Sequence, residues 1–95
     1  DHLVALDRLA ELVAEDGDID GASAVLDEAI AADPYDEPRY AFAGRLLLAA
    51  DRRRAAAALV RRARRALEEL GLTPSGALLE IERGVHAPRR VTERR

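Results

Sequence analysis

The sequence contains no cysteine, so neither a disulfide bond nor a thiolate metal site can form in it. This absence excludes the small secreted domains that disulfides hold together, and it fits a reducing interior. No apolar run approaches the roughly 20 residues that a membrane helix needs. The first residues, DHLVALDRLAEL, mix charged with apolar positions and do not form a signal-peptide core. We therefore expect a soluble, cytoplasmic protein without contact to a membrane.

Aromatic residues are also scarce, at 3% of the 95 residues, although hydrophobic residues reach 48%. Alanine and leucine carry most of the apolar share, which favours helices that pack closely through small side chains. A chain of this length has room for one modest core. Composition therefore predicts a single all-α domain.

The formal net charge of −3 hides a strong asymmetry along the chain. Residues 1–50 carry 3 Arg against 12 Asp and Glu, a net charge of −9. Residues 51–95 carry 12 Arg against 6 Asp and Glu, a net charge of +6. Such polarity can steer the approach of a partner or let the two halves attract each other, but it does not determine the fold.

Apolar residues recur at helical spacing in five segments. The predicted helices cover residues 3–14, the stretch from the turn at 16–18 to residue 33, and residues 37–50, 53–70 and 75–84. Side chains at the start of three helices are predicted N-caps, namely Asp1, Asp36 and Ser75. Two residues are predicted to end helices, namely Pro34 and Gly71. The domain is predicted over residues 1–85, with a polar C-terminal tail over 86–95.

A shift of 34 residues lays the first two predicted helices over the next two. Small residues coincide at 10/44, 22/56 and 29/63, and larger residues coincide at 6/40, 13/47 and 26/60. This period and this pattern of small and large residues resemble the tetratricopeptide repeat (TPR). The resemblance implies a TPR-like stack of two antiparallel helix hairpins, with the fifth helix as a C-terminal cap. A helical bundle without repeats would show similar apolar periodicity and is the alternative fold.

A more specific resemblance comes from three segments in sequence order: DPYDEPRY, AADRRRAAAAL and RRALEELGLTPSGALLEI. Together they resemble the bacterial transcriptional activator domain of SARP-type regulators from actinobacteria. Pro34 with Glu37 matches the family's Pro-x-x-Glu start, and ELGLTPS at residues 69–75 matches its Glu-Leu-Gly-x-x-Pro-Ser ending. The glycine of the family's central turn is replaced here by Asp51. The resemblance covers about residues 3–85.

This resemblance implies a protein-interaction module of a bacterial transcriptional regulator. The partners that it implies are a regulator subunit, a sensor domain or RNA polymerase. Regulators of the family usually carry a winged-helix DNA-binding domain before this module, and no segment here resembles one. We therefore expect an excised domain that reaches DNA only through an adjoining domain.

Residues suited to catalysis or metal binding do not form a recognisable set. His2 and His86 lie at opposite ends of the chain, and helix capping or local hydrogen bonding explains Ser23 and Ser75 better than nucleophilic attack. The acidic residues at 16, 18 and 20 lack the spacing of a calcium loop, so helix capping at a tight turn is the better interpretation. The glycines are too scattered for a phosphate-binding loop. We predict no enzymatic activity, no cofactor and no metal.

Two surfaces are candidates for binding. In a TPR-like stack the first helix of each hairpin lines a groove, where four residues are predicted to be exposed: Asp7, Glu11, Arg45 and Leu48. The fourth predicted helix carries a candidate basic surface of Arg54, Arg61, Arg62 and Arg65. An ordinary solvated helix face explains these arginines better than DNA binding, because no aromatic residue lies among them and the domain is acidic. Auxiliary contact with DNA phosphates stays an alternative, as does a homodimer formed through the charge-split surfaces or exposed apolar edges.

Overall fold

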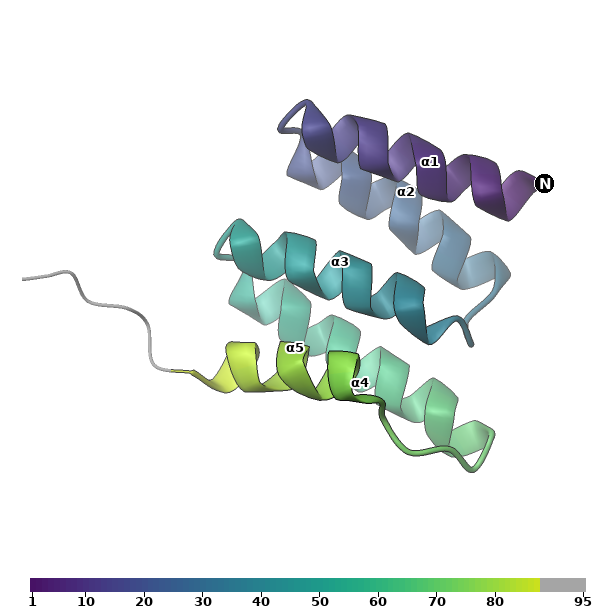
Figure 1. Ribbon diagram of the computed structural model, residues 1–95, viewed down its shortest axis with the longest axis vertical. Coiled ribbons are helices and arrows are strands. Elements are labelled where there is room, and N and C mark those ends of the chain that lie inside the picture. Colours follow the sequence, from purple (N-terminus) through teal and green to yellow (C-terminus); the bar gives the residue numbers. More distant parts are fainter. Residues whose placement is uncertain (88–95) are drawn as a thin grey trace, which may run out of the picture.

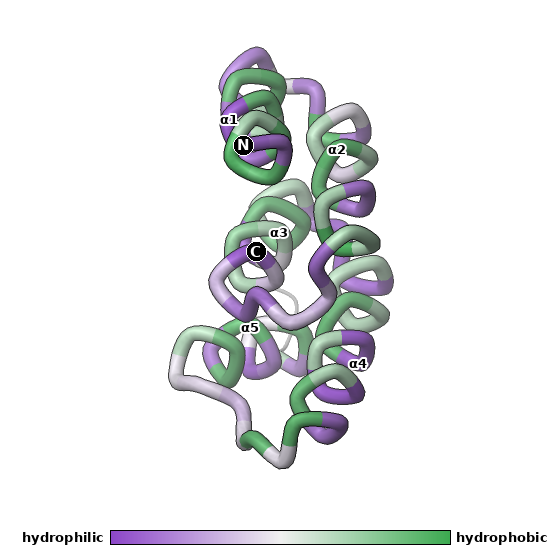
Figure 2. The backbone as a smooth tube through the Cα atoms, turned by 90° about the vertical axis from the view of Figure 1, so that its right-hand side faces the viewer, coloured by the Kyte–Doolittle hydropathy of each residue, from purple (hydrophilic) through white to green (hydrophobic). Residues whose placement is uncertain are grey.

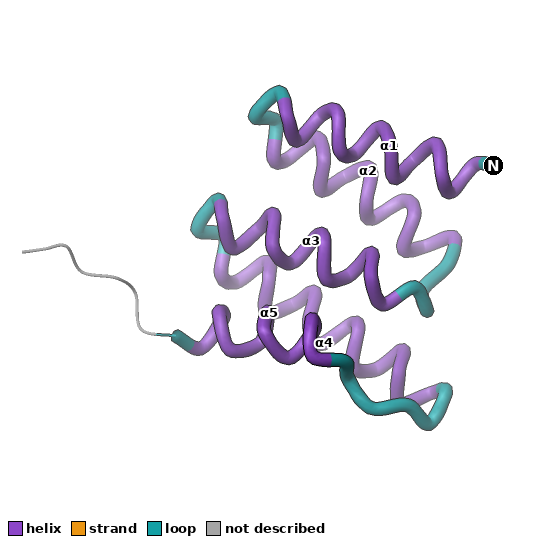
Figure 3. The backbone as a smooth tube through the Cα atoms, viewed as in Figure 1, coloured by secondary structure: helices purple, strands orange, loops and turns teal. Residues whose placement is uncertain are grey.

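The computed structural model describes residues 1–87 and contains five α-helices and no strand in that part (Figures 1 and 3). The helices are α1 (His2–Glu15), α2 (Ile19–Ala32), α3 (Glu37–Ala49), α4 (Arg53–Glu69) and α5 (Gly76–His86). Every helix predicted from the sequence is present. The part of the predicted tail from residue 88 onward lies outside the described residues.

The helices form two layers, with α1, α3 and α5 side by side in one layer and α2 and α4 in the other (Figures 1 and 2). Helix α1 packs against α2 and α3 against α4, while α5 covers α3 and α4. Helix α2 contacts α3 and joins the two hairpins into one stack. This arrangement confirms the TPR-like stack of two hairpins with a capping helix.

Side-chain hydrogen bonds mark the start of every helix except α4. The carboxylates of Asp1, Asp18 and Asp36 accept a backbone N–H at 2.9, 2.9 and 3.2 Å from the first turns of α1, α2 and α3. Ser75 caps α5 in the same way. The structure thus confirms the predicted caps, and within the acidic turn Asp18 caps α2, whereas Asp20 pairs with Arg52.

The turn between α3 and α4 contains the only non-glycine residue with positive φ in residues 1–87, Asp51 at φ 60°. Glycine adopts this left-handed conformation without a steric cost, and aspartate tolerates it better than most residues. Asp51 thus has a backbone conformation that glycine adopts readily, at the position where the family pattern described above has glycine.

Fully buried alanines line the contacts within each hairpin. Ala22 and Ala29 of α2, and their counterparts one repeat later, Ala56 and Ala63 of α4, have no exposed surface. Without larger side chains between them, the paired helices approach closely, and leucine, isoleucine and valine side chains fill the seam between the hairpins. The repeat seen in the sequence is therefore a repeat of packing.

Gly44 of α3 and Gly84 of α5 differ in how much room the neighbouring side chains leave for a larger residue. A Cβ atom added at Gly44 would lie 2.6 Å from Cγ2 of the buried Ile81, whose branched side chain has little rotational freedom. A Cβ added at Gly84 would come too close only to the terminal Cδ1 of Leu48, at 2.6 Å, and this atom can rotate away. Gly44 therefore sets how closely α5 approaches α3.

Gly44→Ala is expected to lower the free energy of unfolding by about 1–2 kcal/mol, because overpacking exceeds the gain in helix propensity. Gly84→Ala is the matched control, and we expect it to be neutral or slightly stabilising. Urea denaturation followed by circular dichroism measures both. Equal stability of the two variants would show that Ile81 of α5 does not pack closely on Gly44.

Candidate interaction surface

The face formed by α1, α3 and α5 contains a hollow at the junction of the two hairpins. Its volume is about 240 Å³, and its lining comes from α1, α3 and the cap of α3: Asp7, Glu11, Asp36, Pro38, Arg39 and Phe42. A second, shallower hollow continues it toward the end of α1 and is lined by Glu11, Ala14, Glu15 and Phe42. Both hollows are lined by Glu11 and Phe42 and are therefore adjacent, and we call the two together the α1–α3 trough.

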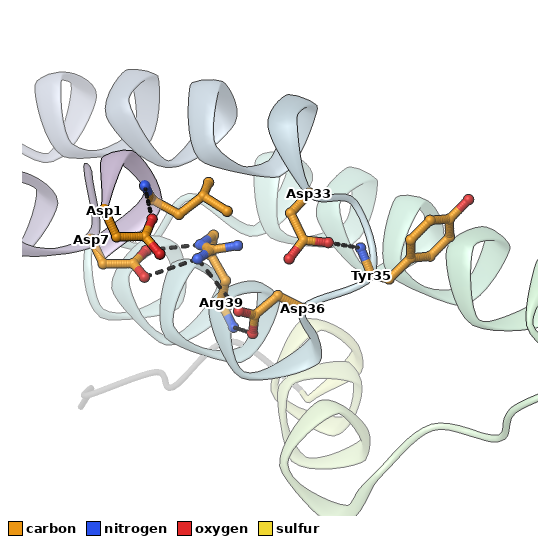
Figure 4. A network of polar contacts seen from close by, with 7 residues as sticks. Asp1, Asp7, Asp33, Tyr35, Asp36 and Arg39 are labelled. Carbon is orange, nitrogen blue, oxygen red and sulfur yellow. Dashed lines mark hydrogen bonds and ion pairs between the residues drawn. The ribbon is translucent and has the colours of Figure 1, made fainter. Parts of the chain in front are cut away.

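One wall of the trough is built around Arg39, whose side chain is only 4% exposed. Its Nε and Nη2 donate to the two carboxylate oxygens of Asp7 at 2.8 and 2.9 Å, and Nη2 lies 3.4 Å from Asp36 (Figure 4). Nη1 is buried and finds no hydrogen-bond acceptor among residues 1–87. This bidentate pair joins α1 to α3 and holds two carboxylates at the junction of the hairpins.

The hydrogen bonds from Arg39 lower the pKa of Asp7 from its ordinary value of 3.8, although burial opposes this effect. The same hydrogen bonds raise the pKa of Arg39, and the nearby negative charge of Asp36 raises this pKa further. Both members of the pair are therefore charged at neutral pH, and the wall keeps its ionic character.

The four predicted groove residues do not all lie in the same environment. Glu11 is exposed, lines the trough and lies 3.2 Å from Nη1 of Arg8, whereas Arg45 is exposed on α3. Asp7 lines the trough but is half-buried by its pair with Arg39. Leu48 is half-buried near Gly84 of α5 and lines neither hollow.

Sequence reasoning did not single out the trough residues Asp36, Arg39 and Phe42 as parts of a binding surface. Arg39 and Asp7 are 32 residues apart, and nothing in the helical periodicity marks Arg39 as buried. Phe42 offered a signal, since it is the only phenylalanine in the chain and lies outside the inward stripe of its helix.

The predicted basic surface on α4 divides into paired and unpaired arginines. Arg62 lies 3.1 Å from Asp27 of α2, and Arg52, just before α4, pairs with Asp20. Arg54, Arg61 and Arg65 are exposed and have no ion pair or hydrogen bond within the described residues. Their spacing of seven and four residues places these three on one face of α4.

The residues considered for catalysis lie apart from one another. His2 begins α1, His86 ends α5, and Ser23 lies half-buried within α2. No group of three or more His, Cys, Asp or Glu side chains within residues 1–87 is arranged to hold a metal ion. In the same part of the chain no helix combines the length and the apolar character needed to cross a bilayer.

A family model described as "Bacterial transcriptional activator domain" matches residues 1–86. No curated protein and no solved structure matches the chain. The family match covers all five helices, from the cap of α1 to the end of α5.

Proposed function

The chain belongs to the bacterial transcriptional activator domain family and is a domain of a transcriptional regulator; on that premise we propose that it is the regulator's protein-interaction module and acts without catalysis. The observation that supports this most is the α1–α3 trough, an open depression on the face where a TPR-like stack binds its partners. The partner we propose is a regulator subunit, a sensor domain or RNA polymerase, in the cytoplasm of an actinobacterial-type host.

The test compares promoter activation with DNA occupancy in the regulator that contains this chain. Arg45→Glu and Glu11→Arg each reverse a charge on the exposed face of the α1, α3 and α5 layer. We expect each to lower activation of a reporter gene by about fivefold or more, which corresponds to a loss of about 1 kcal/mol in partner binding, and to leave promoter occupancy unchanged. Glu68→Arg on α4 is the control outside this face. Full activation by both variants would refute the proposal.

A second candidate function, auxiliary contact with DNA phosphates, has support from the three unpaired arginines of α4. In gel shifts of the regulator, the joint change of Arg54, Arg61 and Arg65 to glutamine should reduce the salt dependence of the binding constant. We expect the slope of the logarithm of the binding constant against the logarithm of the salt concentration to fall in magnitude by up to about 0.9 for each arginine that contacts a phosphate. Arg62→Gln is the control, because Asp27 already pairs with Arg62. An unchanged slope would remove this candidate.

Self-association is the remaining alternative, and the exposed leucines of α1 support it. Leu9 and Leu12 are each 46% exposed, and α1 lies at one end of the stack within the described residues (Figure 2). Light scattering at several protein and salt concentrations tests this alternative. A monomer at all of them would remove it.

A further inference from the structure

The α1–α3 trough has a strongly negative lining. Four carboxylates face it, from Asp7, Glu11, Glu15 and Asp36, whereas Arg39 is the only cation in its lining. Arg39 is already engaged by Asp7 and Asp36, so it offers no free charge to an anionic ligand. An anion that entered the trough would meet an excess of like charge.

The carboxylates differ in how free they are to bind a cation. Asp7 and Asp36 are held in place by Arg39 and need no rearrangement to present an ordered negative wall. Glu11 pairs with Arg8 at 3.2 Å, but both side chains are at least half exposed, so the pair is weak and easily exchanged. Glu15 is exposed and has no partner within the described residues.

Three apolar residues also line the trough. Phe42 lines both hollows, is half-buried and packs against the core, Pro38 lines the first hollow, and Ala14 lines the second. An aromatic ring attracts a cation placed over its face, and an alkyl chain packs on it. A lining that combines an aromatic ring with several carboxylates fits a side chain that has an aliphatic stem and a cationic head.

We propose that the α1–α3 trough receives an arginine or lysine side chain from a basic segment of the partner protein. This inference rests on the proposed function and names the chemistry of the partner. The stem packs on Phe42, and the head group replaces Arg8 at Glu11. A neighbouring basic residue reaches Glu15, about one helical turn further along α1. An apolar partner helix fits less well, because it would bury these carboxylates without a counter-charge.

A second copy of the chain is a competing occupant of the trough, since it presents three exposed, unpaired arginines on α4. The trough and the α4 arginines are different surfaces, so such a contact would be head-to-tail and would produce open chains of molecules unless it closed into a ring. We therefore favour a segment of another protein, and the experiment distinguishes the two.

The experiment titrates the ¹⁵N-labelled chain with a capped alanine- and leucine-rich peptide that contains two arginines four residues apart. We expect saturable changes in the amide signals of α1 and α3, with the largest changes near Glu11 and Phe42. A peptide with citrulline at both positions keeps the shape but lacks the charge, and it should bind at least about tenfold more weakly. Equal binding of the two peptides would overturn the proposal, as would signal changes confined to α4 or α5.

Variants of the chain locate the binding. Glu11→Gln and Glu15→Gln should each weaken binding of the arginine peptide by about three- to fivefold, and Phe42→Leu should weaken this binding by a similar factor. Glu68→Gln and Glu80→Gln are matched controls, because both carboxylates are exposed and lie outside the trough lining. If the controls weakened peptide binding equally, the effect would be one of overall charge, and the trough would not be the binding site.

Failure of this inference can be separated from failure of the proposed function. If the peptide does not bind but Arg45→Glu or Glu11→Arg still lowers promoter activation, the layer of α1, α3 and α5 binds a partner of different chemistry. If trough signals change when the chain is diluted without peptide, and Arg61→Gln suppresses that change, the occupant is a second copy. Either result would overturn the inference.

Discussion

Leu26→Ala is expected to lower the free energy of unfolding by about 3 kcal/mol, because it opens a cavity at the seam between the two hairpins. Leu26 is 1% exposed and is one of the two largest fully buried side chains in residues 1–87. It lies beside a hollow that Ala43 and Leu47 of α3 and Leu59 of α4 also line. Leucine and alanine both favour helices, so the loss comes from packing rather than from propensity.

Chemical denaturation at 25 °C measures this loss, and the midpoint of thermal unfolding should fall by about 4–8 °C for each kcal/mol. Leu12→Ala is the matched control, since the same atoms are removed from a side chain that is 46% exposed. It should cost no more than about 0.5 kcal/mol. If both variants lost the same stability, the seam between the hairpins would not be the core of the fold.

The sequence was sufficient to predict the five helices because their signals are local. Asp36 and Ser75 precede helical periodicity and cap α3 and α5, while Pro34 follows α2, which ends at Ala32. In the second repeat Glu68 replaces the corresponding proline, and α4 accordingly runs for 17 residues where α2 has 14. The stack of hairpins followed from small residues that recur at a fixed spacing.

The binding surface was harder to predict because it depends on contacts between repeats. Helix α3 packs against α2, α4 and α5, and its Arg39 donates hydrogen bonds to Asp7 of α1. Helical periodicity alone therefore cannot separate the open face of α3 from its buried faces. Leu48 illustrates this difficulty. Its spacing placed it in the groove, but the approach of α5 at Gly84 half-buries it.

One charge pair between α2 and α4 lies close to the repeat spacing. The shift of 34 residues aligns Asp27 with Arg61, next to the Arg62 with which it pairs. The same shift aligns Asp7 with Ala41, two positions after the Arg39 with which it pairs, so the repeat does not mark that contact. That contact depends on how far the second hairpin is rotated against the first, which is a property of the assembled stack.

Asp7→Ala is expected to cost about 2 kcal/mol of stability, and more than Arg39→Met costs. Without Asp7 the guanidinium of Arg39 stays buried, with only the longer contact to Asp36 and with Nη1 still unsatisfied. An unpaired buried charge costs about 3–5 kcal/mol, and access of water through the half-exposed position of Asp7 reduces this figure. Arg39→Met instead removes the buried charge and leaves carboxylates that water can solvate, so we expect a loss of about 1 kcal/mol.

The pH dependence gives a second measurement of the same pair. Because Arg39 lowers the pKa of folded Asp7 below its ordinary 3.8, the pair contributes stability above that pH and loses it as the pH falls further. The wild-type chain and Asp7→Ala should therefore converge in stability below about pH 4. A constant difference between them down to pH 2 would contradict the ion pair. So would a double variant whose loss equals the sum of the two single losses.

The Arg39→Met variant also connects stability with binding. It removes the only cation in the lining of the trough and releases Asp7 and Asp36 from their pair, so the trough becomes more negative by one charge. If the trough receives a basic side chain, this less stable variant should bind the arginine peptide about two- to fivefold more tightly than the wild-type chain. If the substitution only destabilised the fold, the variant would bind the peptide more weakly. Tighter binding by a destabilised protein would therefore identify the trough carboxylates as the groups that recognise the peptide.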